Sequence, residues 1–256
     1  MKVLFGIYVF ALGSIFASFF GVIIDRVPRN LSIVKPSSRC DRCGHELNWY
    51  ENIPVFSYLF LKGRCSKCHE NIGSFNFFYE LIGGISLLLI YLKFGLTIEC
   101  LLVSLVSLAM LLIAGYDYKT HTVLNVCLWA LFGCCVLLLI YRVCFLKYPI
   151  TPYIFSILLA VIFFLLLKVI MNKVLNKESL GSGDIYLVGI MGLVFEPFEL
   201  ILAILIASLT GSIISLLKIK FGKNQREDEI AFCPYLCIGF YMIFIFGDIF
   251  IRLLLR

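Results

Sequence analysis

Residues 181–196 read GSGDIYLVGIMGLVFE, a glycine-rich turn that carries Asp184 and leads into a short apolar segment. As a helix, the stretch from Asp184 to Glu196 would reach only about 20 Å, whereas a membrane span takes about 20 residues and 30 Å. This segment decides the fold. Counting it or omitting it sets the number of spans and the side of the membrane on which each later loop lies.

The composition is that of a membrane protein. Of the 256 residues, 61% are hydrophobic and 15% are charged, which exceeds what a soluble domain of this length can bury. Apolar windows of about 20 residues recur at 3–24, 78–96, 98–116, 122–141, 152–171, 197–217 and 230–251. With residues 184–196 as an eighth, short or partly shielded span, we expect an all-α polytopic membrane protein of about eight transmembrane helices.

The distribution of positive charge favours eight spans over seven. With eight, residues 25–77, 117–121, 172–183 and 218–229 share one face, which, together with Lys168 at the end of its helix, receives 16 of the 22 Lys and Arg residues. The positive-inside rule makes that face cytoplasmic and puts the N-terminus outside. Topology and anionic lipid head groups account for the net charge of +6, so no nucleic-acid partner is expected.

The predicted organisation is a first transmembrane helix (1–24), a cytoplasmic insertion (25–77) and a membrane-embedded core (78–256). The insertion holds two CxxC pairs, Cys40/Cys43 and Cys65/Cys68. Four thiolates at this spacing are typical of a closed structural zinc site, a zinc ribbon. The alternatives are free thiols, disulfides, which are rare on the cytoplasmic side, or replacement of one ligand by a neighbouring histidine.

Those histidines are His45 and His69. The other cysteines lie in or beside apolar windows and are expected to pack as small hydrophobic residues. They are Cys100, Cys127, Cys134, Cys135, Cys144, Cys233 and Cys237.

Asp117 and Asp184 both fall at the predicted cytoplasmic boundary. Taken alone, Asp184 suits an N-cap after a glycine turn, and Asp117 suits a solvated loop. Asp117 follows the C-terminal end of its span, however, where the helix dipole disfavours negative charge. If the two carboxylates meet at about 4 Å, repulsion of about 4 kcal/mol leaves one proton shared between them. That is the protonation state of an aspartic protease.

These residues carry a resemblance to the type IV prepilin peptidases, membrane aspartic proteases of the G-x-G-D group. The matching segments run through most of the chain in the family's order. They are 17–19 and 26–28, both CxxC pairs, 49–58, 63–65, 79–81, Asp117, 181–184 and, weakly, 230–236.

The resemblance implies that Asp117 and Asp184 are the catalytic pair that removes leaders from prepilins, pseudopilins or competence pilins. It implies a multi-pass protein in the lipids of the bacterial cytoplasmic membrane, with its active site near the cytoplasmic face. It also implies N-methylation of the new N-terminus with S-adenosylmethionine, which the family links to the insertion and to the glycine matching Gly63. The chain departs from the family at Tyr186 and at residues 123–125.

The alternative function is a transporter or channel. Its intramembrane carboxylates would bind ions and its zinc module would be regulatory.

Overall fold

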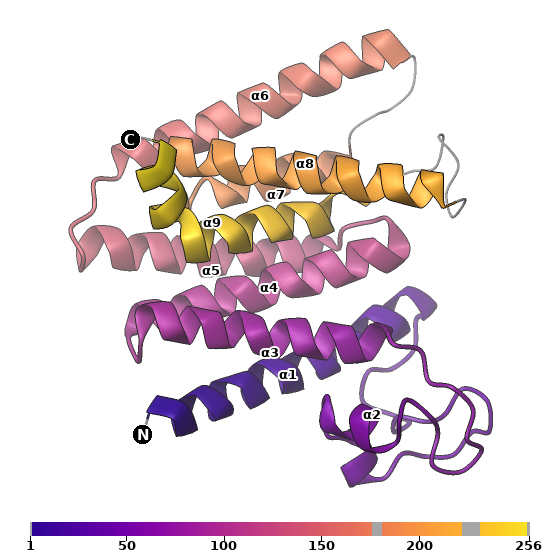
Figure 1. The fold of residues 1–256 in the computed structure, drawn as a ribbon. Helices are drawn as coiled ribbons and strands as arrows, with labels where there is room; N and C mark the ends of the chain where they lie inside the picture. The colour runs from indigo at the N-terminus through magenta and orange to yellow at the C-terminus, as the bar shows by residue number, and fades with distance from the viewer. Residues whose placement is uncertain (1, 176–180, 222–230, 255–256) are drawn as a thin grey trace. The chain divides into compact units, whose positions relative to one another are not determined.

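The computed structural model describes residues 2–175, 181–221 and 231–254. Within these ranges the chain forms α-helices, two short 3-10 helices and isolated bridges, without a β-strand (Figure 1). The chain divides into two compact units, Met1–Leu96 and Thr97–Arg256. The expected all-α fold is therefore confirmed.

The first unit consists of two long helices joined by the polar insertion. Helices α1 (Lys2–Arg26) and α3 (Phe75–Phe94) pack side by side, and Ala17 and Ile90 are fully buried in this unit. The insertion between them holds the 3-10 helices η1 (Val27–Arg29) and η2 (Trp49–Asn52) and the short helix α2 (Phe56–Phe60). The predicted boundaries at 24/25 and 77/78 stay a prediction; α3 belongs to the same compact unit as α1.

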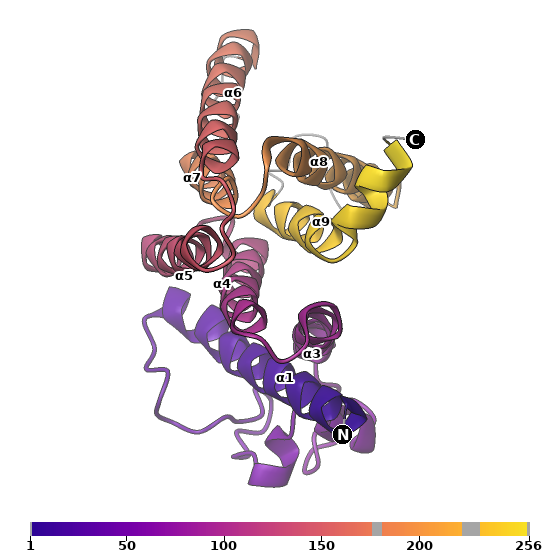
Figure 2. The ribbon, with the colours of Figure 1, turned by 90° about the vertical axis from the view of Figure 1, so that its left-hand side faces the viewer.

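In the described residues, the second unit is a bundle of six helices. Helix α4 packs against both α5 and α9, α6 packs against α7, and α8 packs against α9 (Figures 1 and 2). Their bounds are α4 Ile98–Thr120, α5 Asn125–Cys144, α6 Thr151–Leu175, α7 Ser182–Met191, α8 Pro197–Lys220 and α9 Cys233–Leu254.

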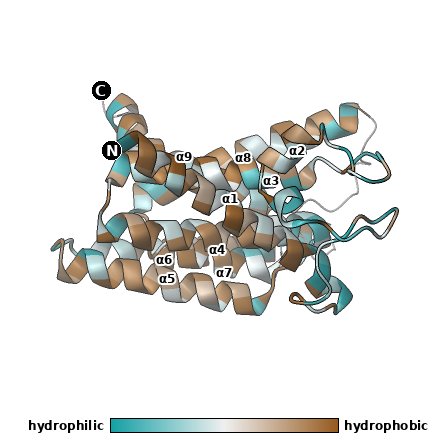
Figure 3. Ribbon diagram, turned by 90° about the horizontal axis from the view of Figure 1, so that it is seen from below, coloured by the Kyte–Doolittle hydropathy of each residue, from teal (hydrophilic) through white to brown (hydrophobic). Residues whose placement is uncertain are grey.

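Seven helices in the described ranges are long and apolar enough to cross a membrane: α1, α3, α4, α5, α6, α8 and α9. They are hydrophobic along most of their length, whereas the insertion is hydrophilic (Figure 3). Large apolar side chains such as Val126, Leu166 and Leu216 are exposed, as expected of surfaces that meet lipid. The chain is a multi-pass membrane protein. Ile230, the first residue of the last predicted span, lies outside the described residues.

Helix α7 is the short segment on which the eight-span count depends, and together with the turns that follow it connects the start of α9 with the end of α5. Its start lies beside the start of α9. The carbonyl of Val194, just beyond its end, accepts a hydrogen bond of 2.8 Å from Arg142 near the end of α5. Arg142 also pairs with Glu99 at the start of α4, at 3.0 Å.

Burial explains how so short a helix is held in place. Leu187, Val188 and Met191 of α7 are almost completely buried, as are Val194 and Phe195 in the turns that follow. The shielding expected for residues 184–196 is therefore present, and α7 with these turns leads the chain to the start of α8.

Candidate active site and metal centre

Asp117 and Asp184 meet at the start of helix α9. Asp117 lies in the last turn of α4, is 5% exposed, and its Oδ2 accepts a hydrogen bond of 3.3 Å from the backbone N–H of Cys233. Asp184 lies in the first turn of α7, and its Oδ1 accepts a hydrogen bond of 3.2 Å from the Cys233 thiol. Cys233 thus binds both carboxylates, although 67 residues separate them in the sequence.

Two helix N-termini converge on this carboxylate pair. The first N–H groups of a helix have no partner within it, and the aligned peptide dipoles make this end positive. Cys233 is the first residue of α9, and Asp184 is the third residue of α7. The start of α9 therefore offsets the unfavourable position of Asp117 at the C-terminal end of α4.

The interpretation of Asp184 as the N-cap is wrong. Gly181 occupies the N-cap position of α7, and a glycine has no side chain that could cap. The third-residue position frees the Asp184 carboxylate for the contact with Cys233. Gly183 lets the start of α7 approach the connection between α4 and α5. A Cβ atom at Gly183 would lie 3.0 Å from Cγ2 of Val123, tighter than ordinary van der Waals contact.

The C-terminal end of α4 is closed by His121. Its backbone is left-handed, with φ of 52°, and its N–H donates to the carbonyl of Asp117 at 2.9 Å. Asp117 interacts electrostatically with both Asp184 and His121. The interpretation of Asp117 as a solvated loop residue is wrong, since its side chain is buried within the helix.

The role of Cys233 was missed by the sequence analysis. It was grouped with the cysteines expected to pack as small hydrophobic residues, and Cys237 behaves largely in that way, buried with its thiol 3.3 Å from the carbonyl of Met110. Cys233 is equally buried but is directed at two carboxylates. The available signal was the position of Cys233 at a helix start, immediately before Pro234. Because proline has no N–H, the backbone N–H of Cys233 is the donor at that end of the helix.

The four predicted zinc ligands form one cluster in the insertion. The Sγ atoms of Cys40, Cys43, Cys65 and Cys68 all lie within 4.8 Å of one another. Two of the distances are 3.8 Å, between Cys40 and Cys68, and 3.9 Å, between Cys43 and Cys65. A zinc tetrahedron with bonds of about 2.3 Å has edges of about 3.8 Å. The cysteine cluster therefore fits a zinc ion.

The two CxxC segments have the same local structure. In the first, Cys40 N–H donates to the carbonyl of His45, and in the second, Cys65 N–H donates to the carbonyl of Glu70, both at 2.9 Å. The residue after each second cysteine, Gly44 or His69, is left-handed. In the second segment the N–H groups of Cys68 and Lys67 lower the pKa of the Cys65 thiol to about 7.

A buried glutamate supports the cluster. Oε2 of Glu51 accepts a hydrogen bond of 2.7 Å from the N–H of Asn48 and lies 3.3 Å from Nε2 of His45. The hydroxyl of Ser66, inside the second CxxC pair, and the Asn48 N–H lower the pKa of Glu51. His45 is thus directed toward Glu51, and the tight group of potential metal ligands consists of the four cysteines alone.

A constrained turn lies between the CxxC pairs. Val55 has φ of 65°, which is unfavourable for a β-branched residue, and its N–H donates to Oε2 of Glu80 at 2.8 Å. Glu80 is a buried residue of α3, so this bond fixes the insertion to the helix. The family-like segments 49–58 and 79–81 therefore meet here.

Comparison with known proteins identifies two matching regions. Residues 11–94 match the bacterial peptidase A24 N-terminal domain, and residues 104–216 match the type IV leader peptidase family. No solved structure matches the chain.

Curated relatives include proteins named prepilin leader peptidase/N-methyltransferase. The chain is 34% identical to one from Myxococcus xanthus over 84% of its own length, and it spans 63% of that relative. It is 28% identical to one from Pseudomonas aeruginosa, with 93% of the chain and 89% of the relative covered. A Bacillus subtilis relative is 27% identical, with 93% of each covered.

Proposed function

This chain belongs to the type IV leader peptidase family, and on that basis we propose that it removes the leader of type IV prepilins with Asp117 and Asp184 as its catalytic pair. The observation that carries the proposal is the convergence of both carboxylates on Cys233. Two acids in one buried place have a cost that a purely structural role does not explain.

The proposed chemistry is hydrolysis of a peptide bond by an activated water. The ionised carboxylate of the pair takes a proton from the water, whose oxygen bonds to the scissile carbonyl carbon. The protonated partner donates a hydrogen bond to the carbonyl oxygen, where negative charge develops. Collapse of the tetrahedral intermediate breaks the carbon–nitrogen bond, and the leaving amine takes up a proton.

The surrounding helix ends suit this chemistry. The N-termini of α7 and α9 are positive, which stabilises the net negative charge of a pair that shares one proton. The contacts from Cys233 hold Oδ2 of Asp117 and Oδ1 of Asp184, so each carboxylate keeps a second oxygen for the proposed chemistry. We place this site near the cytoplasmic face, since the positive-inside rule puts the loop after α4 on that side.

The proposed substrates are prepilins, together with the pseudopilins and competence pilins of the same class. A prepilin has a basic leader and a hydrophobic stem. The stem can lie in the bilayer while the junction between leader and stem reaches the membrane boundary.

The cysteine cluster would hold one structural zinc ion. Four protein ligands leave no position for water, so the metal would stabilise the fold of the insertion and would take no part in hydrolysis.

A second activity, methylation of the new N-terminus with S-adenosylmethionine, is part of the proposal because the relatives' names include it. The chain contains no glycine-rich dinucleotide fingerprint, and we assign no residue to S-adenosylmethionine. The transporter alternative is not favoured, given the family to which the chain belongs.

The test is substitution of each carboxylate without loss of the fold. Asp117→Asn and Asp184→Asn should each abolish leader removal from a co-expressed prepilin, measured by mass spectrometry of the pilin N-terminus. Asp25→Asn is the matched control, because Asp25 forms an exposed pair with Arg29 at 3.3 Å. If both Asn variants still process the prepilin while inserted normally in the membrane, the catalytic assignment is lost.

A further inference from the structure

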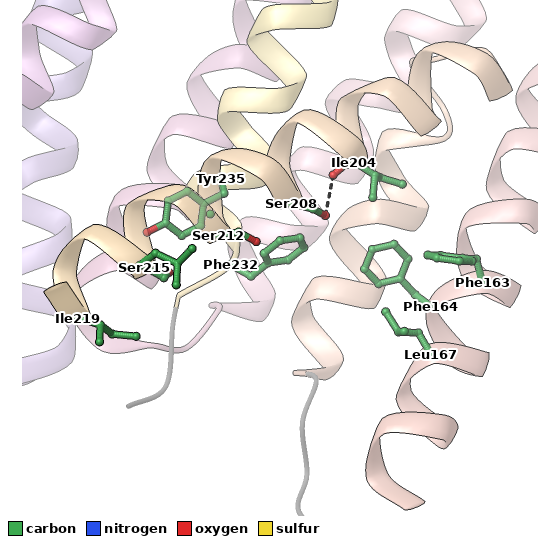
Figure 4. A pocket seen from close by; sticks show the side chains of 12 residues that line it. Phe163, Phe164, Leu167, Ile204, Ser208, Ser212, Ser215, Ile219, Phe232 and Tyr235 are labelled. Carbon is green, nitrogen blue, oxygen red and sulfur yellow. Dashed lines mark hydrogen bonds between the residues drawn. The ribbon is translucent and has the colours of Figure 1, made fainter. Parts of the chain in front are cut away.

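An apolar groove of about 700 Å³ opens in the second unit between helices α6 and α8. Phe163, Phe164 and Leu167 of α6 line one wall, and Ser208 and Ser212 of α8 lie on the other (Figure 4). The first turn of α9, with Tyr235 and the preceding Phe232, closes one side of it.

The groove is long enough to hold a piece of a transmembrane helix. Its lining runs along α8 from Ile204 to Ile219, which is about 22 Å of helix. That is most of the hydrocarbon thickness of a bilayer, about 30 Å. An occupant lying along α8 would therefore contact the groove over about four turns.

The α8 wall has the composition of a helix–helix contact within a membrane. Ser208, Ser212 and Ser215 are spaced three or four residues apart, so they share one face of α8. Small residues at this spacing let two membrane helices approach closely. Ser208 and Ser212 are exposed in the groove, and the Ser208 hydroxyl bonds to the carbonyl of Ile204 in its own helix, which satisfies it in lipid.

The groove and the carboxylate pair share the segment at the start of α9. Phe232 lines the groove, and the next residue is Cys233, which hydrogen-bonds to both Asp117 and Asp184. Tyr235, two residues further, also lines it. An extended segment leaving the groove at Phe232 would thus lie one residue from the contact that holds both carboxylates.

We propose that this groove binds the hydrophobic stem of the substrate as a helix and presents the preceding peptide bond to Asp117 and Asp184. The inference rests on the proposed function, because the occupant is the apolar segment that follows the leader. The stem would lie against the serine face of α8, with the aromatic side chains of α6 on its other side. Selection would be for small or slender side chains on the stem face that meets Ser208 and Ser212.

The first experiment fills the groove. Ser212→Phe places a bulky ring on the serine face, and Ile213→Phe is the matched control, since Ile213 is the next residue, is 57% exposed and does not line the groove. Two substrates are compared with purified enzyme: a full-length Pseudomonas aeruginosa prepilin, and a peptide of the same leader and junction that lacks the stem.

The expected result is a loss specific to the stem. Ser212→Phe should slow cleavage of the full-length prepilin about tenfold while cleavage of the stemless peptide stays within about twofold of wild type. Ile213→Phe should change neither. Normal cleavage of the full-length prepilin by Ser212→Phe, or equal loss on both substrates, overturns the docking inference. Wild-type enzyme that cuts neither substrate overturns the proposed function instead.

The second experiment identifies the occupant without relying on turnover. Photoreactive p-benzoyl-phenylalanine is placed at position 163 or 155 of α6 in the Asp184→Asn background. Both side chains are about half exposed, but only Phe163 lines the groove. Crosslinks from position 163 to the prepilin stem, and none from position 155, support the inference. Crosslinks from position 163 only to lipid or to a second copy of the chain overturn it.

Discussion

The thiol of Cys233 lies 3.2 Å from Oδ1 of Asp184 and donates a hydrogen bond to it. Because the N–H of the same residue binds Asp117, a single residue at the start of α9 sets the separation of the two carboxylates. Cys233 is therefore a positioning residue of the proposed active site: its thiol interacts with both carboxylates, and its backbone N–H binds Asp117.

Replacing the thiol should remove its bond to Asp184 and its weaker interaction with Asp117, while the backbone N–H of Cys233 stays bonded to Asp117. Cys233→Ala removes a hydrogen bond to a carboxylate, and because a thiol is a weak donor we expect a loss of about 1 to 2 kcal/mol, or about tenfold in kcat. Cys233→Ser keeps a donor and should stay within about threefold of wild type. Cys237→Ala, buried in the same helix but bonded to the Met110 carbonyl, is the control. Equal losses in all three variants would indicate a packing role for Cys233.

Zinc content should depend on the cysteine cluster alone. Purified wild-type protein should contain about one zinc per chain by inductively coupled plasma mass spectrometry, and Cys43→Ser should contain close to none. Cys127→Ser, which changes a cysteine of α5, should keep the metal. Zinc retained by Cys43→Ser at the wild-type level would exclude the tetrahedral site.

Gly63 should be required for the fold of the insertion. Its φ is +69°, and a Cβ atom would lie 2.8 Å from Oη of Tyr58, so Gly63→Ala should cost about 1 to 2 kcal/mol or more. Gly73→Ala is the control, because Gly73 has open space and no such backbone constraint. We expect Gly63→Ala to lower the thermal unfolding temperature and zinc retention together with methylation. If Gly63→Ala lost methylation while its thermal unfolding temperature and zinc retention stayed unchanged, Gly63 would instead be placed in contact with S-adenosylmethionine.

Arg142 should stabilise the second unit. Its side chain is 12% exposed, pairs with Glu99 and donates to the Val194 carbonyl, so Arg142→Met leaves a largely buried carboxylate without its partner. Loss of one member of such a pair costs about 3 to 5 kcal/mol. Arg142→Met combined with Glu99→Leu should recover part of that loss in thermal unfolding. A double variant less stable than Arg142→Met would show that Glu99 has another role.

The helices could be predicted because lipid-facing segments need an apolar run of fixed length. The window 122–141 became Asn125–Cys144, and 78–96 became Phe75–Phe94, with ends displaced by a few residues. The last window was displaced toward Cys233–Leu254, where Pro234 occupies the first turn. The cysteine cluster was also predictable, since two CxxC pairs specify a local geometry.

Contacts between distant segments could not be predicted in this way. The bond from Cys233 to Asp117 joins residues 116 positions apart, and no local pattern of the sequence specifies it. No local pattern specifies the positive φ of Val55 either, because the partner of its N–H, Glu80, belongs to another element. The groove depends on the orientation of α6 relative to α8, which the apolar pattern of the sequence does not determine.

Helix α7 has a consequence for the membrane itself. Its ten residues cover about 15 Å, half the hydrocarbon thickness, while Tyr186 on its outer side is 63% exposed. Local thinning of the bilayer is one way in which such hydrophobic mismatch is relieved. The head-group layer and its water would then dip toward the start of α7, so the lipid deformed by a short helix would deliver water to Asp184.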